Sequence, residues 1–333
     1  MRILLVQLSF LGDVVLSTPV ISALQKLYPE AELDLLTMPA AKEVVVRDRF
    51  VCDVITFDKR KSERGISGMF RIARQLAGRK YDRVYCLHRS IRTAVVLWLA
   101  RIPHRIGFRD SKGWFLFHET RTRPRGTHEV ERNLSIIQPE MVGDEFDDAI
   151  RLVAPERREL GTEARTAMNE IENFAIIAPG SVWKTKRWSA QHYRTIVERL
   201  LARGLSVIVT GAPSEEQSCR EASFGTEALN LVGKTSLSDL MALISRAELV
   251  VCNDSMTLHL ASGFSRPTVA IFCATSPKFG FGPWKSPHII VEKDGLACKP
   301  CRRHGSMRCP TGTEACMTSL GPNDVWNACQ QLL

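Results

Sequence analysis

Two successive runs of alternating strand-like and helix-like segments constrain the fold of this 333-residue chain more than any other feature. Short apolar segments rich in Val, Ile and Leu alternate with segments whose apolar residues recur at helical spacing. Such alternation is typical of parallel strands joined by crossover helices. The sequence predicts an α/β protein of two Rossmann-like domains, residues 1–160 and 161–333, facing each other across a cleft. The last helix, residues 323–332, is assignable to either domain.

The expected strands follow one another regularly along both halves. They are residues 2–8, 32–37, 52–57, 83–87 and 105–107 in the first half, and 174–178, 206–210, 229–232, 249–252 and 268–272 in the second. Residues 14–27 are predicted to form one helix, because their apolar positions recur at helical spacing. The Arg-rich segment 108–127 has no such period, and we expect a mobile loop over the crevice at the strand ends.

The chain has a formal net charge of +9 and a pI of about 9.2. A basic surplus suits anionic partners such as nucleic acid, anionic lipid or a phosphorylated sugar. Nucleic acid is not an expected partner, because the sequence contains no helix-turn-helix, zinc-finger or RNP-type motif. No apolar run approaches the ~20 residues that a membrane-spanning helix needs, and the first residues do not resemble a signal peptide. We therefore expect a cytoplasmic protein.

A Gly-Asp turn follows the first expected strand. Gly12 permits a close backbone turn, and Asp13 then stands at the beginning of a helix. The helix dipole favours the ionised form of Asp13, which a general base requires. Asp13 is either a helix cap or such a base, and the spacing alone favours the cap.

Polar turns also follow the expected strands of the second half. Ser181 begins a loop in which Lys186 is one of three cations, and such cations can neutralise a departing pyrophosphate. A solvated basic loop is the competing interpretation. Glu215 and Glu216 follow another strand end and could accept a hydrogen bond from a ribose or a base.

The most distinctive stretch is residues 250–272, where an apolar strand runs into Asn-Asp-Ser and a short helix. Asp254 or Ser255 can cap this helix, and the helix N-terminus suits an anion. His259 lies five residues after Asp254 and can address the same strand end. A capping Asp with a half-buried His is the alternative interpretation.

Three missing motifs narrow the chemistry. Neither GxGxxG nor GxxxxGK[ST] occurs, so neither a nicotinamide site nor a Walker loop is expected. No Asp-x-Asp pair is present that could hold a metal on a nucleotide diphosphate. We therefore expect catalysis without a metal or other cofactor, resting on cations, helix termini and a base.

Four of the ten cysteines lie close together near the end of the sequence. Cys298 and Cys301 have the spacing of a metal knuckle, whereas Cys309 and Cys316 match no common zinc finger. A structural zinc on Cys298, Cys301, Cys309 and Cys316 is one interpretation. Free thiols and a loop disulfide are others, and an iron–sulfur cluster is the least favoured.

Taken together, MRILLVQLSFLGDVVLSTPVISAL, THEVERNL, APGSVWKTKRW and NDSMTLHLASGFSRPTVAIF resemble glycosyltransferase family 9, the bacterial ADP-heptose:lipopolysaccharide heptosyltransferases. The resemblance covers nearly the whole chain, and the Cys-x-Pro-Cys tail favours the branch that adds the second heptose. It implies a GT-B fold, with the acceptor bound mainly by the first domain and the nucleotide-sugar by the second. It also implies inverting transfer without a metal.

The resemblance further implies residue roles. Asp13 would be the base and Lys186 the cation on the donor diphosphate. The donor would be bound by Ser181, Lys186, Glu215, Glu216, Thr235, Asp254, Ser255 and His259. Carboxylates and phosphates of the acceptor would meet Gly12, Arg89, Arg92, Arg121 and Arg123.

These expectations give one leading function and three alternatives. The leading one is heptose transfer from ADP-heptose to the lipopolysaccharide inner core, on heptose or Kdo, by an enzyme peripheral on the cytoplasmic face of the inner membrane. The alternatives are a nucleotide-sugar epimerase of related two-domain fold, a transferase of the same family with another sugar donor, and a non-catalytic binding protein.

Overall fold

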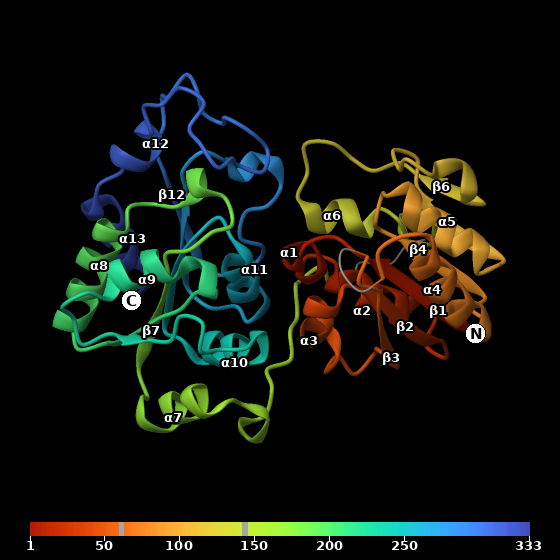
Figure 1. Cartoon of the computed structure of the whole chain (residues 1–333), viewed down its shortest axis with the longest axis horizontal. Coiled ribbons are helices and arrows are strands. Elements are labelled where there is room, and N and C mark those ends of the chain that lie inside the picture. Colours follow the sequence, from red (N-terminus) through yellow and green to blue (C-terminus); the bar gives the residue numbers. More distant parts are fainter. Residues whose placement is uncertain (60–62, 142–145) are drawn as a thin grey trace. The chain divides into compact units, whose positions relative to one another are not determined.

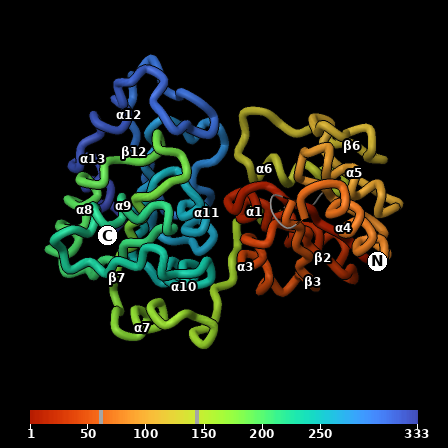
Figure 2. Tube along the Cα trace, in the orientation of Figure 1, coloured from red at the N-terminus to blue at the C-terminus, as the bar shows by residue number. Residues whose placement is uncertain are grey.

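The computed structural model describes residues 1–59, 63–141 and 146–333, which form two compact units (Figure 1). Unit 1 is Met1–Val153 and unit 2 is Ala154–Leu333. The division lies seven residues before the boundary expected at residue 160. Figure 2 follows the trace through unit 1, from red to yellow-green, and then through unit 2, from green to blue.

Unit 1 is built on six parallel strands in the order β3-β2-β1-β4-β5-β6. Register is fixed by pairs such as Leu5↔Leu35 and Leu5↔Tyr85. The strands are β1 (Arg2–Gln7), β2 (Glu32–Thr37), β3 (Asp53–Thr56), β4 (Arg83–Cys86), β5 (His104–Phe108) and β6 (Glu119–Arg121). The helices are α1 (Leu11–Val15), α2 (Thr18–Leu27), η1 (Pro39–Ala41), α3 (Lys42–Val45), α4 (Ile66–Gly78), α5 (Ile91–Leu99), η2 (Trp114–Leu116), α6 (Glu129–Leu134) and η3 (Gln138–Glu140).

Unit 2 repeats this plan, with six parallel strands in the order β12-β11-β10-β7-β8-β9. Its strands are β7 (Phe174–Ala178), β8 (Ser206–Val209), β9 (Leu229–Asn230), β10 (Leu249–Asn253), β11 (Thr268–Phe272) and β12 (His288–Glu292). Its helices are η4 (Arg157–Glu159), α7 (Thr162–Glu170), η5 (Lys184–Lys186), α8 (Ala190–Ala202), η6 (Pro213–Glu215), α9 (Glu216–Ser223), α10 (Leu237–Arg246), α11 (Met256–Gly263), η7 (Pro277–Phe279), α12 (Ala315–Thr318) and α13 (Pro322–Leu332).

The prediction of two Rossmann-like units with parallel sheets is confirmed. In each unit the central strands are buried on both faces, because crossover helices cover the sheet on both sides. One core cluster in unit 1 joins β1 and β4 to α4 and α5, and one in unit 2 joins β7 and β10 to α8 and α13. None of the helices in the described parts of the chain is long and apolar enough to cross a membrane.

Two local expectations were wrong, and one strand was not expected. Residues 14–27 form two helices rather than one, because Pro19 has no N–H to continue a helix and Ser17 Oγ bonds the Val14 carbonyl at 2.8 Å. The expected mobile loop, 108–127, contains η2 and a strand, β6, that pairs with β5. Strand β12 was missed, because its edge position leaves a short, half-exposed segment without a clear alternation.

The last helix, which the sequence left open between the domains, packs in unit 2. Helix α13 contacts α8, β10, β11 and β12. Its buried side chains belong to the unit 2 core, which fixes its place there. They are Val325, Ala328 and Cys329.

Candidate active site

The strand order places a switch point in each sheet. It lies between β1 and β4 in unit 1 and between β7 and β10 in unit 2. In open α/β sheets, ligands bind outside the carboxyl ends of the strands at such a point. Asp13 follows β1, Ser181 follows β7, and Asp254 follows β10. These three residues therefore stand at the ligand-binding edges of their own sheets.

A buried ion pair lies at the switch point of unit 2. The Nζ atom of Lys186 is 2.6 Å from Oδ2 of Asp254, and the two side chains are only 13% and 6% exposed. Thr275 Oγ1 donates to the same carboxylate oxygen at 2.6 Å. Because the Lys186 side chain is enclosed, it can adopt few rotamers. Its ammonium group is therefore held at the strand ends and does not extend into bulk solvent. Such a fixed cation can bind a diphosphate.

The turn that carries Lys186 is held from two sides. Thr185 N and Oγ1 donate to the Ser306 carbonyl at 3.1 and 3.0 Å, and Ser306 N donates to Thr185 Oγ1 at 2.9 Å. Ala274 N donates to the Thr185 carbonyl at 3.3 Å. Residues from far along the chain therefore fix the position of η5.

Asn253 connects the two strands that flank the switch point. Its Nδ2 donates to the carbonyls of Pro179 and Gly180 at 2.8 and 3.3 Å, and its Oδ1 accepts from Trp188 N at 3.1 Å. The side chain is fully buried. Asn253 therefore sets the distance between the two loops that carry Lys186 and Asp254.

Glu215 approaches the same edge from the end of β8. Its Oε2 accepts from Ala212 N at 2.8 Å, and its carboxylate lies against Gly180. A Cβ atom at Gly180 would lie 2.2 Å from Cδ of Glu215, so only glycine leaves room for this carboxylate. Glu216 points elsewhere, because its carboxylate pairs with Arg220 on the exposed side of α9.

The remaining expected donor residues follow strands β7, β9 and β10 in the same unit. Ser181 is buried and its carbonyl accepts from Arg187 Nε at 2.7 Å. Ser255 is the N-cap residue of α11, and His259 is buried on the same helix. Thr235 is half-buried in the loop before α10. In the same loop, Gly233 N donates a hydrogen bond to the Gly211 carbonyl, which follows β8.

Asp13 of unit 1 has the capping role that the sequence allowed. It is the third residue of α1, and its Oδ2 accepts from Phe10 N at 3.0 Å. The side chain is half-buried. Capping leaves Oδ1 outside that bond, so a cap and a base are compatible roles for the same carboxylate.

The expected acceptor arginines differ in what they contact. Arg89 is 40% exposed and pairs with Asp110 at 2.6 Å, and Arg92 donates to the carbonyls of Lys59 and Gly65. Arg121 is largely enclosed and pairs with Glu119 and Glu140 at 2.7 and 3.2 Å. Gly12 lies in the turn of α1 beside Asp13.

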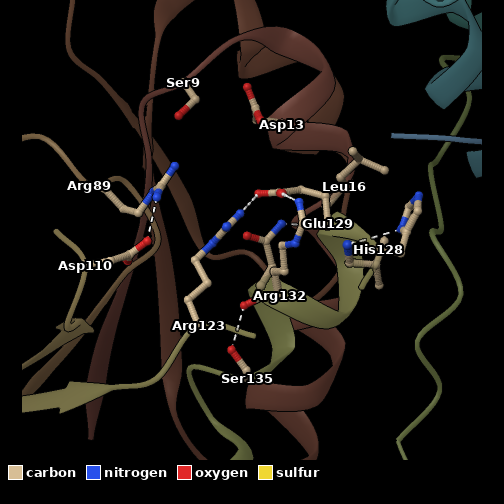
Figure 3. Close-up of polar contacts among 12 residues, drawn as sticks. Ser9, Asp13, Leu16, Arg89, Asp110, Arg123, His128, Glu129, Arg132 and Ser135 are labelled. Carbon is tan, nitrogen blue, oxygen red and sulfur yellow. Dashed lines mark hydrogen bonds and ion pairs between the residues drawn. The ribbon is translucent and has the colours of Figure 1, made fainter. Parts of the chain in front are cut away.

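The segment THEVERNL is hydrogen-bonded to the end of the helix that carries Asp13. Figure 3 shows Arg123 and Arg132 both pointing at the buried carboxylate of Glu129. Asn133 Nδ2 donates to the Leu16 carbonyl between α1 and α2 at 3.0 Å. Arg123 is therefore engaged inside unit 1, and acceptor binding by Arg123 or Arg121 stays a prediction.

A Lys–His pair that was not predicted lies at the switch point of unit 1. Lys59 Nζ donates to the Leu8 carbonyl at 2.7 Å and lies 3.0 Å from His88 Nε2. Burial, then the charges of Lys59 and Arg89, lower the pKa of His88 to about 3, so its ring is neutral and accepts from the ammonium. Lys59 and His88 follow different strands, and no local pattern joins them. Thr275 was missed for the same reason.

The four clustered cysteines carry free thiols. Burial and then the neighbouring Cys298 raise the pKa of Cys301, and burial and then Cys301 raise the pKa of Cys316 to about 11. No group of three or more His, Cys, Asp or Glu side chains within residues 1–59, 63–141 and 146–333 is arranged to hold a metal ion.

The chain is similar in sequence to known glycosyltransferases. The family model described as glycosyltransferase family 9 (heptosyltransferase) matches residues 69–310. Lipopolysaccharide heptosyltransferase 2 of Escherichia coli K12 is 27% identical over 294 residues, which cover 84% of each chain.

Two solved structures share the fold. A family 9 glycosyltransferase from Veillonella parvula superposes with a TM-score of 0.85 at 21% identity, covering 99% of this chain and 96% of that one. Escherichia coli ADP-heptose lipopolysaccharide heptosyltransferase II superposes with a TM-score of 0.81 at 23% identity, covering 100% and 98%. The predicted GT-B fold is confirmed, and the family favours a transferase over an epimerase or a binding protein. The chain belongs to glycosyltransferase family 9, the heptosyltransferase family.

Proposed function

We propose that this glycosyltransferase moves a heptose from ADP-heptose to a hydroxyl of the lipopolysaccharide inner core. The observation that carries the proposal is the buried Lys186–Asp254 pair at the switch point of unit 2, the place where open α/β sheets bind their ligands. The name of the Escherichia coli relative, lipopolysaccharide heptosyltransferase 2, supports this substrate class.

The group around Lys186 in unit 2 suits ADP-heptose. Lys186 offsets the charge that builds on the diphosphate as it departs, and the N-terminus of α11 at Ser255 adds its positive dipole end. Glu215, beside Gly180, accepts from a ribose hydroxyl. Asp254 holds Lys186 in position through their ion pair.

Unit 1 supplies the base. Asp13 accepts the proton of the attacking hydroxyl while the hydroxyl oxygen bonds to the anomeric carbon. The bond from that carbon to the diphosphate oxygen breaks, and ADP leaves with the electron pair. Because attack and departure take place on opposite sides of the carbon, the configuration inverts.

No metal takes part in the proposed step. The sequence has no Asp-x-Asp pair, and Lys186 provides the positive charge that a divalent cation would otherwise bring. Transfer is therefore expected to continue in the presence of EDTA. If EDTA stops the transfer and added Mg²⁺ restores it, this part of the proposal is wrong. A structural zinc on the four clustered cysteines stays a prediction, which metal analysis of protein purified without a His tag tests.

A direct transfer assay tests the proposal. The protein is incubated with ADP-heptose and two truncated cores, one ending in Kdo and one ending in a single heptose. A mass increase of one heptose on either core supports the proposal, and the core that gains it identifies the acceptor. Turnover of ADP-heptose without an acceptor, or transfer only from another nucleotide-sugar, contradicts it. Cell fractionation tests the expected location, in the cytoplasm and peripheral on the inner membrane.

A further inference from the structure

Six large apolar side chains are exposed on three neighbouring elements of unit 1. They are 45% to 72% exposed, whereas the outward sides of helices that cover a sheet are normally polar. Exposed apolar residues are ordinary when scattered, but a contiguous group indicates an interaction surface. The six are Ile66 and Phe70 on α4, Ile91 and Trp98 on α5, and Trp114 and Phe115 in η2.

These three elements form one layer, which we call the α4–α5–η2 face. Helix α4 packs against α5, and α5 packs against η2 (Figure 1). A Cβ atom at Gly113 would lie 2.5 Å from the Ala94 Cβ atom, so η2 is seated directly on α5. The rings of Trp114 and Phe115 are in edge contact, 6.1 Å apart. The opposite sides of α4 and α5 are buried in the unit 1 core.

The chain segments that form this face also carry most of the formal positive surplus of the protein. Residues 64–80 and 89–117 contain eleven Lys or Arg and one acidic residue, Asp110. Eleven positive charges and one negative charge give these two segments a net charge of +10. Because the whole chain has a net charge of +9, the remaining residues together are close to neutral. Arg71 and Arg79 pair with carboxylates of other elements. Exposed cations that make no ion pair among the described residues include Arg74, Arg101, Arg109 and Lys112.

Exposed aromatic residues among unpaired cations fit a surface that is anionic outside and apolar beneath. Trp and Phe side chains stabilise binding by entering the headgroup boundary, and each Lys or Arg near an anionic bilayer adds attraction. A second copy of the chain fits less well, because two such faces would bring like charges together. A nucleic acid would leave the six apolar side chains exposed to water.

We propose that the α4–α5–η2 face docks on an anionic lipid bilayer. Trp98, Trp114 and Phe115 enter the headgroup region, while Arg74, Arg101 and Lys112 contact lipid phosphates. Helices α4 and α5 begin at the edge of the sheet that carries Asp13, since each follows the carboxyl end of a strand. Docking would then bring a lipid-anchored acceptor to that edge, and this consequence rests on the proposed function.

Vesicle cosedimentation tests the docking without using the reaction. Wild type is expected to sediment with phosphatidylcholine vesicles that contain phosphatidylglycerol, to bind pure phosphatidylcholine vesicles much more weakly, and to lose binding as salt is raised. The triple variant Trp98→Ser/Trp114→Ser/Phe115→Ser should lose at least about tenfold in affinity. Arg74→Gln/Arg101→Gln/Lys112→Gln should lose about tenfold or more, and only on anionic vesicles.

The matched control is Phe224→Ser, an aromatic residue of unit 2 that is 69% exposed. It should bind anionic vesicles like wild type. Circular dichroism confirms that each variant is folded. Equal binding to neutral and anionic vesicles, wild-type binding by either triple variant, or an equal loss in Phe224→Ser overturns the proposal. A dimer that the aromatic substitutions dissociate, with no vesicle binding, also overturns it and assigns the face to a second copy.

A paired transfer assay separates this inference from the proposed function. The aromatic triple variant should transfer heptose normally to core oligosaccharide freed from its lipid, but more slowly to the same acceptor embedded in anionic vesicles. An equal loss on both acceptors overturns docking as the role of these residues. If wild type transfers to neither acceptor, the proposed function fails, and the cosedimentation results still decide the docking.

Discussion

Lys186 Nζ lies 2.6 Å from Asp254 Oδ2, although the two residues belong to different loops of unit 2. Thr275 donates to the same carboxylate, and Asn253 joins the loops by bonding the carbonyls of Pro179 and Gly180. The cation is thereby fixed before any ligand binds. A preorganised cation of this kind costs little reorganisation when charge develops on a leaving group.

Lys186→Ala should reduce both transfer and stability. Removal of the ammonium leaves the buried Asp254 carboxylate unpaired, which costs about 3 kcal/mol of the free energy of unfolding. Transfer should fall about a hundredfold or more, because the leaving diphosphate loses its cation. Steady-state kinetics and urea unfolding measure the two effects. Lys184→Ala is the matched control, since Lys184 is exposed in the same turn, and it should change neither quantity much.

Thr185→Val should separate positioning of Lys186 from its charge. The substitution keeps the shape of the side chain but removes the Oγ1 atom that exchanges hydrogen bonds with Ser306. We expect a lower kcat and a weaker affinity for ADP, with the charge of Lys186 retained. Thr195→Val on the exposed side of α8 is the control. Wild-type kinetics in Thr185→Val would show that the Ser306 contact has no part in the site.

Asp13→Asn should abolish transfer and leave stability nearly unchanged. The amide oxygen of Asn can still accept from Phe10 N, so the cap on α1 is kept, whereas the base is lost. The expected fall in kcat is about 10²-fold or more. Calorimetry should find ADP binding intact. Near-normal transfer would mean that Asp13 is only a cap.

Gly180→Ala should disturb the donor site through Glu215. The new methyl group would lie 2.2 Å from the Glu215 Cδ atom, and displacing the carboxylate should cost about 1–3 kcal/mol. Gly180→Ala/Glu215→Ala should recover most of that stability but not the affinity for the nucleotide. Gly78→Ala, which meets no atom within 4 Å, is the control and should be neutral or slightly stabilising. Unfolding curves that rank the three variants otherwise would contradict the contact.

Cys309 should be the first of the clustered cysteines to react with iodoacetamide near neutral pH. Hydrogen bonds from the Thr311 hydroxyl and from the Glu314 backbone lower the pKa of Cys309 to about 7, whereas burial raises the pKa of Cys316 to about 11. The labelling rate of Cys309, followed by mass spectrometry, should therefore rise between pH 6 and 8 and then level off.

Two variants examine the cause of this reactivity. Thr311→Val should slow the labelling of Cys309 at pH 7, because its pKa returns toward the ordinary value. Thr313→Val, which leaves the contact between Cys309 and Thr311 in place, should not. If all four thiols were instead protected from labelling, and EDTA removed this protection, the result would show that they hold a metal.

Much of the architecture could be predicted from local sequence. The apolar segments Phe174–Ala178 and Thr268–Phe272 have the predicted bounds, because a strand buried on both faces of a parallel sheet is a short continuous apolar run in the sequence. Gly12, Asp13, Ser181 and Asp254 were found because polar residues directly after apolar strands mark the ligand-binding edge. The family resemblance rests on the same short segments.

The tertiary structure decided which of these groups touch. Nothing local pairs Lys186 with Asp254, Thr275 with Asp254 or Lys59 with His88, because each partner follows a different strand and only the strand order brings them together. The exposed apolar residues of α4, α5 and η2 likewise look like core residues in the sequence, since an aromatic side chain carries no local sign of which side of a helix the sheet covers. The sequence determined the elements and the kinds of groups at their ends, and long-range packing determined their partners.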